Sequence, residues 1–169
     1  MSLTSKIVAQ VVATLTKSLD LSTPTDAVSP KRTVSFADGT GAGQADVLFT
    51  DKRTLADGIS EDLDLSGSLV DGLGDAITLA RVRAILIVNL GTLSTLKVGG
   101  AAANQFLMFD GADDVVTIRQ GGLLLLADGD DDVTGYPVTA GTGDLLKILH
   151  GGEDTADLDY EIIIVGASA

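Results

Sequence analysis

His150 is the only histidine in the chain, so it is the first residue to consider for catalysis. It ends an apolar run in the segment LLKILHGG, and the sequence has no GxSxG nucleophile elbow to supply a partner serine. A single histidine also cannot build a histidine-rich metal site. The sequence therefore predicts a structural or solvated role for His150.

Two glycine- and aspartate-rich segments are the next candidates for ligand binding. The loop DGTGAG (38–43) lacks the Gly-Lys-Ser/Thr ending of a phosphate loop, and no helical pattern follows it. The segment DGDDD, from Asp128 to Asp132, offers carboxylates to a cation such as Ca²⁺, but without EF-hand spacing or flanking helices. We expect turns at both places, the second as a hairpin loop between strands at 123–127 and 133–139. We expect no tight structural metal and no cofactor.

The composition gives no support to an enzyme. Carbohydrate-active clefts use aromatic platforms, whereas this chain has four Phe, two Tyr and no Trp. The net charge of −13 argues against nucleic acid and anionic membranes as partners, because their phosphates would repel the chain. Without cysteine there are no disulfides, and no apolar run approaches the ~18 residues of a membrane span. We expect a soluble, non-enzymatic protein made in the cytoplasm.

The elements that must position these residues are predicted to be strands. Short runs rich in Val, Ile and Thr alternate with turns, and the 20 Gly residues favour many tight turns. This pattern predicts an all-β, antiparallel sandwich with little helix, formed as a single domain over residues 1–169. The expected strands are 31–36, 45–55, 61–67, 77–88, 95–99, 105–109, 115–118, 123–126, 136–140 and 160–165.

The run 77–88 is the best candidate for a long central strand. Its small or apolar face, which includes Ala84, Leu86 and Val88, is expected to line the core. Arg81 and Arg83 lie on the other face beside apolar neighbours. That face is therefore either partly covered by acidic residues or another chain, or it is solvated.

Residues 7–21 fit two periodicities. A helical face is one reading, while alternation of apolar residues with Gln10, Thr14, Thr16 and Ser18 fits a strand with one wet face. The Val and Thr content favours the strand. The segment STPTD (22–26) predicts a turn. Residues 1–30 are thus either an N-terminal arm or a strand of the single domain.

Several phrases of the sequence resemble small virion proteins encoded among the head genes of tailed bacteriophages. They are DKRTLADGISEDLDLSG (51–67), VGGAAANQF (98–106), IRQGGLLLL (118–126), YPVTAGTGDLLKI (136–148) and EIIIVGAS (161–168). The resemblance spans most of the chain and is weakest over residues 1–30. It implies a capsid decoration or cement protein, with a β-sandwich of the jelly-roll type bound to the outer capsid surface of the virion.

The same resemblance implies the major capsid protein as partner and a homo-oligomer, either a dimer or a trimer. Two alternatives stay open: a tail- or fibre-associated structural module, and a carbohydrate-binding β-sandwich. Because most of the acidic residues lie in the C-terminal half, we expect capsid contact through apolar or basic segments. The candidate contact residues are Lys6, Lys17, Lys31, Arg32, Lys52 and Arg53.

Overall fold

The computed structural model describes residues 2–111, 113–129, 131–152 and 154–169. These residues form strands and connecting loops and contain no helix, which confirms the all-β prediction. In chain order the strands are β1 (Ser5–Gln10), β2 (Ala13–Thr16), β3 (Thr25–Val28), β4 (Lys31–Asp38), β5 (Gln44–Ala45), β6 (Val47–Leu55), β7 (Ser60–Asp64), β8 (Leu69–Val70), β9 (Ala76–Ile77), β10 (Arg81–Asn89), β11 (Leu96–Gly99), β12 (Val115–Ile118), β13 (Leu123–Ala127), β14 (Tyr136–Pro137), β15 (Leu145–His150) and β16 (Leu158–Ala167).

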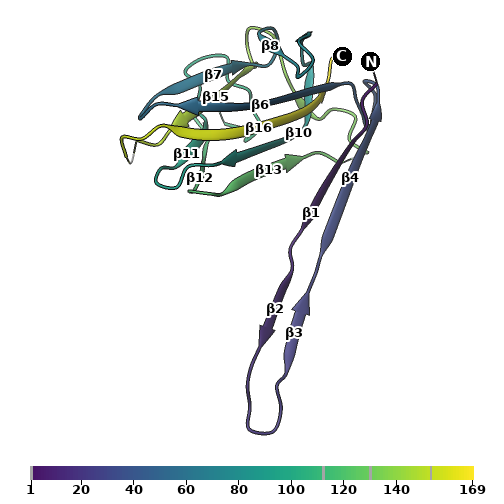
Figure 1. The fold of residues 1–169 in the computed structure, drawn as a ribbon. Helices are drawn as coiled ribbons and strands as arrows, with labels where there is room; N and C mark the ends of the chain where they lie inside the picture. Colours follow the sequence, from purple (N-terminus) through teal and green to yellow (C-terminus); the bar gives the residue numbers. More distant parts are fainter. Residues whose placement is uncertain (1, 112, 130, 153) are drawn as a thin grey trace.

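Two antiparallel sheets form the body of the molecule (Figure 1). The first has the order β13-β10-β16-β6, with β14 also paired to β10, and the second has the order β12-β11-β15-β7. Along the chain, the first long strand of the body pairs with the last, β6 with β16. The pairs β7 with β15, β10 with β13 and β11 with β12 continue this nesting inward. The β-sandwich prediction is thereby confirmed, while its jelly-roll form stays a prediction.

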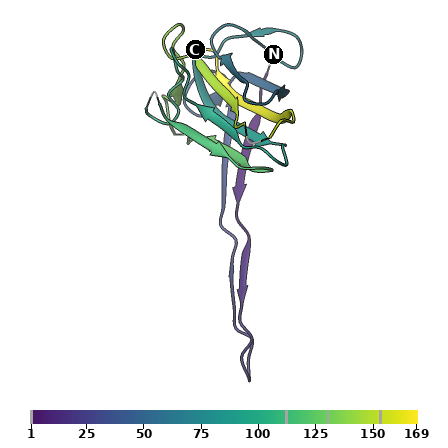
Figure 2. The same cartoon turned by 90° about the vertical axis from the view of Figure 1, so that its left-hand side faces the viewer.

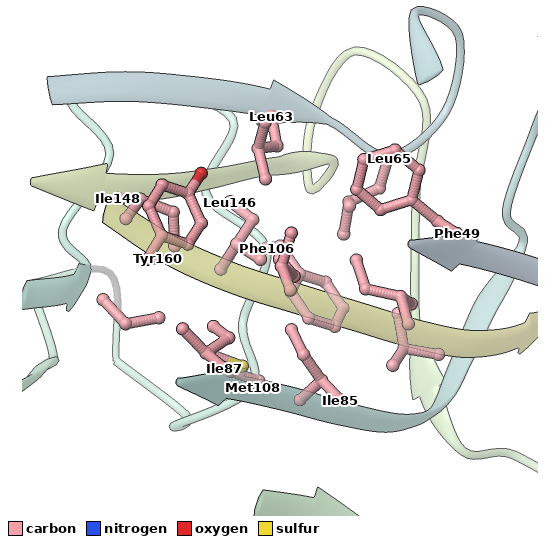
Figure 3. Close-up of a cluster of buried hydrophobic side chains, with 14 of the residues drawn as sticks. Phe49, Leu63, Leu65, Ile85, Ile87, Phe106, Met108, Leu146, Ile148 and Tyr160 are labelled. Carbon is pink, nitrogen blue, oxygen red and sulfur yellow. The ribbon is translucent and has the colours of Figure 1, made fainter. Parts of the chain in front are cut away.

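The core lies between the two sheets. Figure 3 shows Ile85, Phe49 and Tyr160 of the first sheet facing Leu63 and Ile148 of the second. The strands β6, β7 and β15, and β16 as far as Ile164, bury alternate residues, as expected when one face of each sheet packs on the other. Apolar burial of this kind is the main term that stabilises the sandwich.

The central strand β10 corrects the predicted faces of the run 77–88. The strand begins at Arg81, and its core residues are Val82, as predicted, and then Ile85 and Ile87. Leu86, predicted to line the core, lies on the opposite side of the sheet. The pairing of β10 with β16 shifts register between Val82 and Ala84. Such a bulge reverses which face of the sheet the residues after it point to, relative to simple alternation. Sequence alternation alone could not show this shift.

Two further predictions about elements are wrong. Residues 105–109 form no strand; Gln105 makes one isolated bridge to Leu145. The segment 123–139 is not a hairpin, because β13 and β14 both pair with β10 and not with each other. The Asp128–Asp132 segment is instead an excursion between two pieces of strand on the same edge of β10.

Residues 5–38 form a long β-hairpin that projects from the sandwich, and we call it the arm (Figures 1 and 2). One register holds throughout, since Ser5 pairs with Phe36 at the base and Thr16 with Thr25 near the tip. The tip closes with a hydrogen bond from the Leu19 N–H to the Ser22 carbonyl, which leaves a two-residue turn.

Candidate functional site

His150 is buried, and both ring nitrogens are engaged. The Gly152 N–H donates to Nδ1 at 3.0 Å, so Nδ1 must accept. Nε2 lies 3.0 Å from the Ala156 carbonyl and therefore carries the proton that it donates. A histidine held in this way has no free nitrogen to act as a general base. The predicted structural role of His150 agrees with this geometry.

Arg83 joins the two loops that the sequence offered as ligand sites. Its guanidinium is fully buried and donates to Asp128 Oδ2 at 2.7 Å and to the Asp132 carbonyl at 2.8 Å. It also donates to the carbonyls of Gly41 at 2.9 Å and Gln44 at 3.3 Å. Of the readings left open for Arg83, cover by acidic residues is the one observed. We call this set of contacts the Arg83 clamp.

The Arg83 clamp gives Asp128 a structural task. Desolvation raises the pKa of Asp128, and the hydrogen bond and charge of Arg83 oppose that rise. Among the described residues, Asp128 Oδ1 has no hydrogen-bond partner, which fits a site where burial dominates. Within the same residues, no three histidine or acidic side chains group as metal ligands. Asp130, part of the acidic segment, lies outside the described residues.

The arm is the most exposed part of the molecule. Every residue from 8 to 33 is exposed, although the segment carries large aliphatic side chains. Val11 is 65 % exposed, Val12 70 % and Leu15 73 %, and Leu21 at the tip is fully exposed. A two-stranded hairpin is at best marginally stable in water. A hairpin of this length with exposed aliphatic side chains is typical of an element that packs on another surface.

The constant register makes the arm amphipathic, because opposed residues of an antiparallel pair point to the same side. The polar face consists mainly of Ser, Thr, Gln and Lys, with Val8 and Val12 among them. The apolar face also carries Lys17, Asp26 and Arg32. Its apolar members are Ile7, Ala9, Val11, Ala13, Leu15, Leu19, Pro24, Val28, Pro30 and Val34.

The base of the arm packs on the outer face of the sheet β13-β10-β16-β6, the side turned away from the core. Phe36 is buried there with Ala84 and Val165, and Ile7 and Val34 pack against them. Beyond these residues the arm runs away from the sandwich (Figure 2), and among the residues that the structure describes all those from 8 to 33 are exposed. The same face is thus covered at the base and open along the rest of the arm.

Four of the six candidate contact residues, Lys6, Lys17, Lys31 and Arg32, lie on the arm, and all four are exposed. The other two lie on β6 and have intramolecular partners. Lys52 is 2.8 Å from Asp159, which raises the pKa of Lys52, chiefly through the hydrogen bond between them.

Arg53 makes ion pairs with Asp51 at 2.8 Å and with Glu61 at 2.6 Å. The Tyr160 hydroxyl donates to Glu61 at 2.8 Å, so the group ties β6, β7 and β16 together at one end of the sandwich. The charge of Arg53 is therefore neutralised by carboxylates of its own molecule. The role of all six residues in capsid contact stays a prediction.

Sequence reasoning missed the arm as a hairpin and the burial of Arg83. The signal for the hairpin was present, because Val- and Thr-rich segments lie on both sides of the turn predicted at 22–26. The observed turn is earlier, at residues 20–21, and β3 already begins at Thr25. No comparable signal marks Arg83, whose partners are 39 to 49 residues away in sequence.

No protein-family model matches the chain, and no curated protein is similar to it in sequence. The described residues contain no helix able to span a bilayer. Any assignment of function is therefore a proposal, argued from the geometry of the molecule and from what its sequence predicts.

Proposed function

We propose that this chain is a non-enzymatic structural protein of a tailed-bacteriophage virion that binds the outer surface of the capsid and stabilises it. The observation that carries the proposal is the arm, an amphipathic hairpin that is exposed beyond its base in the part of the chain that the structure describes. A decoration protein must engage neighbours in a lattice, and a projecting hairpin extends its reach beyond its own body.

Charge supports an orientation for this contact. The arm has four basic and three acidic residues, whereas residues 39–169 have seven basic and twenty-one acidic residues, for net charges of +1 and −14. Lys6 and Lys31 lie on the polar face of the arm. In the proposal, this polar face meets the shell and the acidic sandwich faces outward.

Two linked contacts also explain how such a protein would stabilise a shell. Once one contact forms, the next becomes intramolecular, so its effective concentration is high. An arm that bridges from its own site to a neighbouring one would hold adjacent subunits together. This gain depends on geometry and requires no tight individual contact.

The nested strand pairing of the body supports a jelly roll as the scaffold. In a jelly roll, a long antiparallel hairpin is folded over so that two Greek keys form two sheets. The pairs β6–β16, β7–β15, β10–β13 and β11–β12 follow that scheme. We include this architecture in the proposal.

Neither alternative from the sequence gains a specific observation. Carbohydrate-binding sandwiches present exposed aromatic platforms, and all six Phe and Tyr side chains here are buried or half-buried. A tail- or fibre-associated module would also use an arm, and its copy number per virion would separate it from a decoration protein.

The proposal is tested by sedimenting the purified chain with phage shells assembled without it. We expect the wild type to pellet with shells. Lys6→Glu/Lys31→Glu should bind at least about tenfold less, because the proposed contact pairs these lysines with acidic groups of the shell, which the reversed charges would repel. The matched control, Lys97→Glu/Lys147→Glu, changes net charge equally on β11 and β15, far from the arm. Failure of the wild type to pellet would refute the function; equal losses in both variants would refute the contact surface.

A further inference from the structure

The outer face of the sheet β13-β10-β16-β6 is apolar and only partly covered. Leu86 of β10 stands between Leu125 of β13 and Ile163 of β16, and Val88 stands beside Leu123. Leu123 is 63 % exposed and Ile163 is 38 % exposed, and the other three are half-buried. We call these five residues the open patch. Contiguous apolar surface of this kind marks interaction sites on soluble proteins.

The open patch continues directly from the surface that the arm base covers. In successive cross-strand rows, Ala84 and Val165 lie under the arm, and Leu86 and Ile163 form the next row beyond it. A cleft of about 250 Å³ lies at this border, with Ile7 on its arm side and Leu125 among the residues on its sheet side. The molecule therefore already shows how the apolar face of an arm packs on this sheet.

The arm of the same molecule cannot fill the rest of the patch. It leaves the sheet after its base and runs away from the sandwich in both views (Figures 1 and 2). Its distal apolar residues, including Val11 and Leu15, stay exposed while the open patch also stays exposed. One molecule thus carries two unsatisfied apolar surfaces of the same type as the pair joined at the arm base.

We propose that the distal apolar face of the arm, from Val11 to Leu19, packs on the open patch of a second copy of this chain. The reach is sufficient. The 14 residues from Ile7 to Asp20 extend roughly 43 Å at about 3.3 Å per step, whereas a four-stranded sheet is only about 15 Å across. The arm can therefore cross the whole sheet of a neighbour.

Charge favours a second copy as the occupant. The arm carries a net charge of +1 and the remainder of the chain −14, so the arm of one copy is attracted to the body of another. Continuity with the packing at the arm base supplies the second argument. If two copies exchange arms reciprocally, the two contacts are identical and close the assembly as a twofold dimer.

This inference goes beyond the proposed function and does not depend on the shell. The polar face of the arm, with Lys6 and Lys31, stays free for a shell contact while the apolar face lies on a neighbour. On a capsid, arms packed in this way would link decoration copies to one another as well as to the shell.

Light scattering coupled to size-exclusion chromatography tests the proposal on the purified full chain. We expect the wild type to be a dimer, and the arm variant Val11→Asp/Leu15→Asp to be a monomer. An unpaired carboxylate in an apolar contact should weaken association by about 100-fold or more. The matched control Thr14→Asp/Thr16→Asp places the same charges on the polar face of the same part of the arm and should stay a dimer.

A patch variant, Leu123→Asp/Ile163→Asp, should also be a monomer. Mixing it with the arm variant should restore a heterodimer, because one intact arm and one intact patch remain in the pair. Contact between two arms, or between two patches, would give no such rescue. A monomeric wild type or a mixture without heterodimer would overturn the proposal, whereas loss of shell binding by a chain that still dimerises would refute only the proposed function.

Cysteine cross-linking gives a second readout if an aspartate variant fails to fold, as judged by circular dichroism. The chain has no cysteine of its own, so two differently tagged single variants, Leu15→Cys and Leu125→Cys, can be mixed and oxidised. We expect a mixed disulfide between the two tags. The matched pair of Leu15→Cys with Ile59→Cys, an exposed residue next to β7 of the other sheet, should give none; equal yields from both pairs would overturn the proposal.

Discussion

Replacing Arg83 by methionine should destabilise the fold more than most single changes to this chain. The change leaves Asp128, whose side chain is 3 % exposed, as a buried carboxylate without its counter-charge. It also removes the donors that bond the carbonyls of Gly41, Gln44 and Asp132. Breaking a buried pair from one side costs about 3–5 kcal/mol.

That cost can be measured by thermal unfolding. For a domain of this size, 1 kcal/mol shifts Tm by about 2–4 °C, so Arg83→Met should lower Tm by roughly 6–20 °C. The matched control is Arg81→Met, two residues away on β10. Arg81 is partly exposed and donates one hydrogen bond, to the Val133 carbonyl, and its loss should cost no more than about 1 kcal/mol.

The deficit of Arg83→Met should also depend on pH. Burial already raises the pKa of Asp128, and removing Arg83 removes a cause that lowers it. A carboxyl whose pKa is higher in the folded chain stabilises the fold below its unfolded pKa, and loses that contribution as pH rises. The deficit should therefore be largest near pH 7 and shrink as pH falls toward 3.8, the ordinary value.

The double variant Arg83→Met/Asp128→Asn removes the unpaired charge and should recover at least about 1 kcal/mol of the loss. The reasoning fails if Arg83→Met costs no more than Arg81→Met, or if its deficit is the same at pH 7 and pH 4. Because Gly41 lies in the loop after β4 and Gln44 begins β5, which pairs with β4, the Arg83 clamp also fixes where the arm leaves the sandwich.

Two further changes address single hydrogen bonds. Tyr160→Phe removes the buried hydroxyl that donates to Glu61, and chemical denaturation should show that the free energy of unfolding falls by about 1.5–3 kcal/mol. A fall of less than about 0.5 kcal/mol would contradict this role. Hydrogen bonds from the Gly141 N–H and then the Ser66 hydroxyl hold the pKa of Asp144 below 3.8, so its contribution exists above the unfolded pKa and is lost as pH falls through the folded value. The free energy of unfolding of the wild type should exceed that of Asp144→Asn by about 1–2 kcal/mol at pH 7 and by much less in acid. A difference that does not change with pH would contradict this role of Asp144.

The sequence predicted the strands best where alternation and turn residues agreed. The runs around Leu63, Lys97 and Ile162 lie in strands as expected, because each has one face on the core. The bulge between Val82 and Ala84 is a property of pairing with β16, and no residue type in the run 77–88 announces it. That single shift exchanged the predicted core and outer faces of β10 from Ala84 onward, while Val82, before the shift, lies in the core as predicted.

In the candidate site, too, local sequence patterns could be predicted and contacts between distant segments could not. Alternation along residues 7–21 predicted one wet face and one apolar face, and the apolar face is real, but sequence cannot say what covers it. Phe36 and Ile7 pack on the outer face of the sheet of their own molecule, whereas Leu15 is exposed to solvent because the hairpin has left the sandwich at that point. The environment of Arg83 could not be predicted for a related reason, because its burial depends on loops that only the fold brings together.

The central claim, that this chain decorates a phage capsid, is tested most directly by its copy number in purified virions. Quantitative mass spectrometry can measure the chain relative to the major capsid protein. The account predicts near-stoichiometric abundance, as befits a protein bound across the shell lattice. A handful of copies per particle would place the chain in the tail or portal region, and its absence would contradict a virion role altogether.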